Sequence, residues 1–93
     1  MILRADLHVH SLASADSSST IAQLAAEAKA RGLDAIAVTD HDACTPLPES
    51  AGVLLIPAVE ISTDRGHVLG LFLKTPVSGE FLRGYPPLAG CVA

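Results

Sequence analysis

Two histidines near the start of the chain, His8 and His10, are separated by a single residue. Apolar and polar residues nearly alternate over residues 2–9, which predicts a strand. Strand side chains alternate with a period of two, so both imidazoles would point to the same face. Such a pair forms a clamp for a metal ion. An isolated pair of this kind fits surface or structural histidines equally well, so the neighbouring residues must decide.

The other chemistry-bearing residues fall where predicted strands end. All four histidines lie at or beside such ends, with acidic residues next to them. In barrels of parallel strands and helices, the C-terminal strand ends converge on one mouth. Imidazole together with carboxylate suits zinc, manganese or iron better than calcium. The set comprises His8, His10, His41, His67, Asp6, Asp16, Asp40, Asp42 and Glu60.

Glu60 is the most informative acid, because it interrupts an otherwise apolar run over residues 56–61. An unpaired buried carboxylate costs on the order of several kcal/mol, so a buried Glu60 needs a cation or hydrogen-bond donors. A carboxylate that bridges two metal ions is one interpretation. A solvated residue on an edge strand is the other.

A helix and a second strand follow the first polar loop. Thr20 and Gln23 fit a capping box, and Gly32 supplies a stop at the other end. Between them, apolar residues recur at helical spacing. The continuous apolar run 35–39 predicts a strand buried on both faces. This order of strand, helix and strand indicates an α/β fold.

The remainder of the chain divides into a hairpin and a tail. Apolar runs at 53–61 and 67–73 flank the turn signal at residues 64–66, so they predict two adjacent strands. Proline and glycine punctuate residues 75–93, for which no element is predicted. We therefore expect a domain portion at 1–74 and an irregular tail at 75–93.

Composition restricts the possible partners. The chain has 93 residues, 49% of them hydrophobic, and a formal net charge of −4. The few basic residues are scattered, which disfavours nonspecific binding to nucleic acid. Neither a signal peptide nor a membrane span is indicated, so a cytoplasmic protein is expected. Cys44 and Cys91 lie far apart and outside any metal-binding spacing, and are expected to be unpaired thiols.

Four ordered motifs resemble the polymerase and histidinol phosphatase (PHP) superfamily. They are Asp6–Ser11, Ala37–Asp42, Ile56–Ser62 and Gly66–Leu71, with the end of the predicted helix between the first two. The resemblance covers residues 2–73. It implies a distorted TIM-like barrel of seven α/β units, of which this sequence would hold only the first strands and helix.

The resemblance also implies a site for up to three divalent metal ions, either manganese, zinc or iron. His8 and His10 would hold the first ion, and Glu60 would bridge it to a second ion bound by His67. Asp16 would bind the third ion with His41, although the family often has histidine at that position. Asp6 and Asp40 would orient histidines, a role that metal sites generally require.

The implied activity is metal-assisted hydrolysis of a phosphate ester of a small metabolite or nucleotide. Metal-activated water would serve as the nucleophile, so no protein nucleophile is needed. Arg65, beside His67, could contact the substrate phosphate, or could simply be solvated. A PHP module of a replicative DNA polymerase is a lower-ranked interpretation.

The sequence departs from the family pattern after residue 67. The family's later histidine and Asp-x-His ligands have no counterpart, since no histidine follows His67 and no aspartate follows Asp64. Early barrel strands on their own would keep open edges and an uncovered apolar face. We therefore expect a truncated or frameshifted reading frame, or one piece of a split domain. In that case the expected partners are a second copy of the chain or a complementing second fragment. Metal binding without catalysis is the alternative function.

Overall fold

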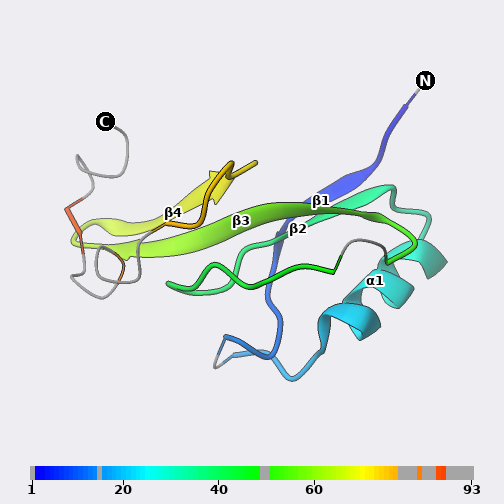
Figure 1. The fold of residues 1–93 in the computed structure, drawn as a ribbon, viewed down its shortest axis with the longest axis horizontal. Coiled ribbons are helices and arrows are strands. Elements are labelled where there is room, and N and C mark those ends of the chain that lie inside the picture. The colour runs from blue at the N-terminus through cyan, green and yellow to red at the C-terminus, as the bar shows by residue number, and fades with distance from the viewer. Residues whose placement is uncertain (1, 15, 49–50, 78–81, 83–85, 88–93) are drawn as a thin grey trace.

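The computed structural model describes residues 2–14, 16–48, 51–77, 82 and 86–87. Its elements are β1 (Ala5–Val9), α1 (Ile21–Ala30), β2 (Ala35–Val38), β3 (Leu54–Thr63) and β4 (Gly66–Leu71). The strands of this part of the chain form one sheet in the order β1-β2-β3-β4. Neighbours pair in parallel up to β3, and β4 is antiparallel to β3. Figure 1 shows α1 on one side of this sheet.

The predicted ends of α1 are confirmed. Thr20 accepts a hydrogen bond from the Gln23 backbone N–H at 3.1 Å, and the Gln23 side chain accepts one from Thr20 N–H at 2.8 Å. Gly32 follows the helix with φ of 76°, a conformation that glycine adopts without steric cost. The buried helix residues are Ala25 and Ala28. Small side chains at these positions let the helix lie close to the sheet.

β2 is the buried centre of the sheet, as its apolar run predicted. All four of its residues are buried. Ile36 and Val38 pack with Ala28 on the side of α1, whereas Ala35 and Ala37 pack with residues of β3 on the opposite side. Burial on both faces explains why this strand is continuously apolar.

β3 is shared between two kinds of pairing. Leu54 to Pro57 pair in parallel with β2, and Ala58 to Thr63 pair antiparallel with β4. Gly66, at φ of 117°, begins β4 just after the turn. The predicted hairpin is therefore confirmed, and Figure 1 shows the single long strand that joins both halves of the sheet.

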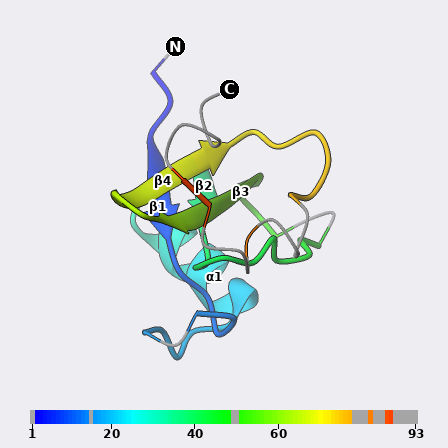
Figure 2. The ribbon, with the colours of Figure 1, turned by 90° about the vertical axis from the view of Figure 1, so that its left-hand side faces the viewer.

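On the sheet face opposite α1, several large apolar side chains stay exposed around the buried residues of β2 and β3. A groove of about 420 Å³ on this face is lined by residues that include Leu3, Leu7, Leu54 and Phe72. On the other side, α1 packs against β2, as Figure 2 shows. The described residues thus form a partial, mixed sheet with one helix, and the complete seven-unit barrel stays a prediction.

One residue of the predicted tail contributes to packing. Leu82 is only 4% exposed and lies with Val59 and Ile61 in a buried cluster. Residues 78–81, 83–85 and 88–93 of that tail, including Cys91, lie outside the described residues. Within the described residues, no helix has the length and apolarity to cross a membrane.

Candidate metal centre

Backbone hydrogen bonds bring the C-terminal ends of β1 and β2 together beside β3. Thr39 N–H donates to the carbonyl of Val9 at 2.7 Å, so the chain leaving β2 follows β1. Glu60 N–H donates to the carbonyl of Asp40 at 3.0 Å, and Asp42 N–H donates to the carbonyl of Glu60 at 2.8 Å. This segment therefore lies between the end of β1 and the middle of β3.

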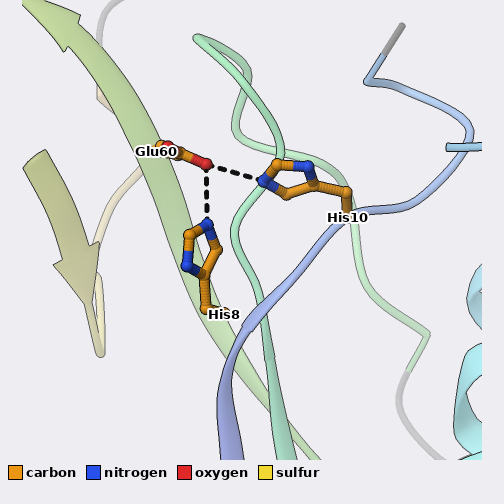
Figure 3. A group of neighbouring side chains, drawn as sticks. All are labelled: His8, His10 and Glu60. Carbon is orange, nitrogen blue, oxygen red and sulfur yellow. Dashed lines mark hydrogen bonds and ion pairs between the residues drawn. The ribbon is translucent and has the colours of Figure 1, made fainter. Parts of the chain in front are cut away.

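The first group of side chains consists of His8, His10 and Glu60. Nε2 of His8 lies 2.9 Å from Oε1 of Glu60, and Nε2 of His10 lies 2.7 Å from the same oxygen. Figure 3 shows both rings pointing to that oxygen, His8 from β1 and His10 from the segment that follows β1. The register of β1 against β2 is irregular between Asp6 and Val9, where the histidine motif begins. The predicted clamp is present in geometry.

A second group joins Glu60 to the other two histidines. Nδ1 of His67 lies 3.2 Å from Oε2 of Glu60, and Nδ1 of His41 lies 3.7 Å from Oε1. The Glu60 side chain is 6% exposed, whereas the His67 side chain is 52% exposed. The carboxylate is therefore buried beneath imidazoles that reach solvent.

A third group forms around Asp16. Its Oδ1 lies 2.9 Å from Nδ1 of His10, and its Oδ2 lies 3.1 Å from Nε2 of His41. Asp16 is 56% exposed. In each of the three groups, the potential ligand atoms lie within 4.8 Å of one another. His10, His41 and Glu60 each belong to two groups, so the groups form one continuous cluster.

The cluster shifts the pKa values of its members. Burial raises the pKa of Glu60, but the hydrogen bonds from His8 and His10 outweigh it and leave that pKa below its ordinary value. Burial lowers the pKa of His10, but hydrogen bonds to Glu60 and Asp16 outweigh it and leave that pKa raised. The pKa of Asp16 is lowered in the same way by His10 and His41, against its desolvation. The carboxylates are therefore ionised at neutral pH.

This arrangement suits a divalent cation. Both ring nitrogens of His10 face a carboxylate, at 2.9 and 2.7 Å. A neutral imidazole has only one N–H, so one of these contacts would set a nitrogen lone pair against a carboxylate oxygen. Protonation of His10 resolves the conflict, and so does a cation between the two atoms. Imidazole nitrogens mixed with carboxylate oxygens are ligands that zinc, manganese and iron accept.

Comparison with known proteins supports the same interpretation. Residues 6–72 match the family described as PHP domain. The chain belongs to this family. It is 64% identical over 36 residues to a "Probable phosphatase" of Syntrophotalea carbinolica, covering 39% of this chain and 15% of that protein. It is 40% identical over 78 residues to a "Phosphoribosyl 1,2-cyclic phosphate 1,2-diphosphodiesterase" of Eggerthella lenta, covering 71% of this chain and 29% of that protein. The chain thus spans less than a third of the length of either relative.

PHP domains are metal-dependent, and the six residues predicted as ligands are the ones that form the three groups. The structure brings all of them into contact: His8, His10, Asp16, His41, Glu60 and His67. Their assignment to particular metal ions stays a prediction.

The two acids predicted to orient histidines have other contacts. Asp6 accepts a hydrogen bond from the backbone N–H of His8 at 3.1 Å rather than from its ring. Asp40 is fully buried, and the hydrogen bonds to its side chain come from Ser11, Ser14 and Thr45. Arg65 lies exposed in the turn between β3 and β4, where its backbone N–H donates to Thr63 Oγ1 at 3.1 Å.

Two sets of contacts in this PHP domain were not predicted from sequence. Ser11, Ser14 and Thr45 surround Asp40, and Ser62 donates to both oxygens of Asp42 through its backbone N–H and its hydroxyl. Asp42 has φ of 53°, a conformation in which aspartate is enriched. The polar character of residues 11–19 was the available signal, but small polar residues in a loop do not identify their partner.

Proposed function

We propose that this PHP domain belongs to a metal-dependent phosphoesterase that hydrolyses a phosphate ester of a small metabolite or nucleotide. The observation that carries the proposal is the burial of Glu60 within reach of imidazoles from β1, β4 and the segments that follow β1 and β2. A carboxylate shared by several imidazoles is suited to bridging two cations. The names of the two relatives, a phosphatase and a cyclic phosphate diphosphodiesterase, support phosphate ester chemistry.

In this proposal, His8 and His10 hold one ion, and Glu60 bridges it to a second ion held by His67. Asp16 and His41 hold a third. Manganese, zinc or iron, when bound, would lower the pKa of a bound water and polarise phosphoryl oxygens. Asp16, at 56% exposure, would hold its ion where substrate can arrive from solvent. Arg65 would contact the substrate phosphate, for which a guanidinium is well shaped.

A second candidate function is metal binding without hydrolysis. The exposure of His8 at 54% and of His67 at 52% favours this alternative, because an open site neither excludes bulk water nor encloses a substrate. A complementing polypeptide that covers the exposed apolar groove at Leu7, Leu54 and Phe72 would then complete the domain. We also propose a cytoplasmic location, which the free thiol of Cys44 supports because thiols persist in reducing compartments.

Metal content and turnover, measured on the same purified chain, separate the two candidates. The chain would be loaded with Mn²⁺ or Zn²⁺, its bound metal counted by mass spectrometry, and its hydrolysis of p-nitrophenyl phosphate and bis(p-nitrophenyl) phosphate followed. About three metals per chain with turnover lost in Glu60→Gln would support the phosphoesterase. Metal binding without turnover would favour the second candidate, and a chain that binds no metal would refute both.

A further inference from the structure

Asp40 is a buried carboxylate with an unusually complete set of donors. Its side chain accepts from Ser11 N–H at 2.6 Å, Ser11 Oγ at 2.5 Å and Ser14 Oγ at 2.8 Å, and also from the Thr45 hydroxyl. Burial raises the pKa of Asp40, but the bonds from Ser11 and Thr45 outweigh it and keep that pKa low. Hydrogen bonds to a charged group are about twice as strong as neutral ones. Asp40 therefore holds in place the loop after β1, through Ser11 and Ser14, and the segment after β2, through Thr45.

Ser14 connects this anchor to His41. Its hydroxyl donates to Asp40 Oδ1 and also accepts from the backbone N–H of His41 at 2.9 Å. The loop after β1 is thereby fixed to the backbone at His41 itself. The Ser14 hydroxyl, oriented by Asp40, is thus a direct link between the loop and the backbone of His41.

The loop that Asp40 contacts, through Ser11 and Ser14, leads from His10 toward Asp16. It is closed by further hydrogen bonds, from Ser14 N–H to the Ser11 carbonyl at 3.0 Å and from Ser17 Oγ to the His10 carbonyl at 2.9 Å. Asp16 projects from this loop and is 56% exposed, with its carboxylate contacting the rings of His10 and His41. An exposed side chain gains little positional restraint from packing, so the loop must supply it.

We propose that Asp40 is a positioning residue that holds Asp16 opposite His10 and His41 through Ser11 and Ser14. It thereby sets the metal affinity of the Asp16 group without contacting metal, a role that rests on the proposed metal centre. This role differs from the predicted one, in which Asp40 would orient a histidine ring. Here its hydrogen bonds act on the loop and, through Ser14, on the backbone of His41. The groups that contain Glu60 would be much less sensitive to Asp40.

A purely structural role for Asp40 would give a different result. If Asp40 only stabilised the fold, its loss would weaken the three groups together, in proportion to the fraction of unfolded chain. A positioning role weakens one group selectively in protein that is still folded. The distribution of the effect among the groups is therefore the measurement that decides.

The test is a titration of the metal-free chain with Mn²⁺, with each binding step followed by calorimetry and folding followed by circular dichroism. The variants are Asp40→Asn, Ser14→Ala and Asp16→Ala. Ser62→Ala is the matched control, because it removes a serine hydroxyl from a different carboxylate, that of Asp42. We expect Ser14→Ala to weaken one binding step by ~10- to 100-fold, the range for outer partners of metal ligands. The same step should be lost in Asp16→Ala and unchanged within about threefold in Ser62→Ala.

The double variant Ser14→Ala with Asp16→Ala completes the test. If Ser14 acts through Asp16, the double variant will bind metal no worse than Asp16→Ala alone, which is the non-additivity expected of coupled residues. Additive losses, or equal weakening of every step, would overturn the proposal. Should Asp40→Asn not fold, Ser14→Ala still decides, because it leaves Asp40 with its bonds from Ser11 and Thr45. A wild-type chain without any metal binding would instead refute the proposed function itself.

Discussion

Two buried carboxylates lie close together in this PHP domain and are compensated in opposite ways. Asp40, at 0% exposure, is surrounded by hydroxyl and backbone donors that keep their hydrogens at any physiological pH. Glu60, at 4% exposure, is surrounded by imidazoles, whose nitrogens can bind either a proton or a metal ion. The same buried charge therefore makes a permanent anchor at Asp40 and an exchangeable binding site at Glu60. In the site at Glu60, a metal ion can replace the protons.

The largest effect expected from this difference is on metal affinity. Glu60→Gln removes the carboxylate from two of the three groups, and should weaken Mn²⁺ binding by more than the ~10- to 100-fold typical of outer partners. Equilibrium dialysis of the folded variant against Mn²⁺ would measure the loss. An affinity within threefold of the wild-type value would show that Glu60 is not a ligand.

In the absence of metal, loss of Asp40 should lower the free energy of unfolding more than loss of Glu60. Asp40→Ala leaves Ser11 N–H and two buried hydroxyls without their acceptor, which should cost about 2–3 kcal/mol in the free energy of unfolding. Glu60→Ala should cost less, since His8 and His67 are half exposed and can bond to water. Urea denaturation in the presence of a chelator gives both values. A larger loss for Glu60→Ala would break the contrast between anchor and exchangeable site.

The pH dependence of the metal-free stability should have two limbs. The lowered pKa values of Glu60, Asp16 and Asp40 contribute stability above their unfolded values of about 4.5 and 3.8, and it is lost as pH falls through the folded values. The raised pKa of His10 contributes stability below its unfolded value of 6.5, which is lost as pH rises through the folded value. Urea midpoints would be measured from about pH 3 to about pH 9, the range in which carboxylates and imidazoles titrate. They would show both limbs.

Variants show which residues cause the acid and the alkaline parts of this pH dependence. His10→Gln should abolish the alkaline limb and leave the part of the acid limb that belongs to Asp40. Metal binding should show the reverse trend and strengthen as pH rises, because imidazoles must be neutral to act as ligands. An alkaline limb that persists in His10→Gln would assign it to another group.

The smallest effect is expected for a hydroxyl that touches neither carboxylate. Thr20→Ala removes the N-cap of α1 and should cost about 1 kcal/mol in unfolding free energy. Its Mn²⁺ affinity should equal that of the wild type. This variant sets the background against which the changes at Ser14 and Asp40 are judged, and a loss of metal affinity in it would mean that stability alone governs binding.

The features that repeat with a simple period were predictable from sequence. The period of two placed His8 and His10 on one face, the capping box located the start of α1, and an apolar run with a single acid identified Glu60. These are local patterns, in which the residue and its neighbours in sequence carry the whole signal. The contact among the six candidate ligands was expected from one further rule, that the C-terminal ends of parallel strands in a barrel meet at one mouth.

The partners of Asp40 were not predictable in the same way. Ser11 and Thr45 are 29 and 5 residues from it, in segments without regular structure. Which hydroxyl meets which carboxylate depends on how the loop closes in three dimensions. An uncovered apolar face was expected from the sequence, but hydropathy alone did not identify Leu7 and Phe72 as exposed, because apolar residues are usually buried.

Both the parallel and the antiparallel parts of the sheet depend on β3, because it pairs with β2 and with β4. One strand carries Glu60, holds β2 along its first half and holds β4, with His67, along its second half. Any excursion that detaches β3 from β2 therefore separates Glu60 from His8, His10 and His41 in a single event, whereas the group around Asp16 has no residue on β3. Metal binding should consequently slow amide hydrogen exchange along β3, including Leu55 and Ile56 in the half that pairs with β2, since binding stabilises only the closed state.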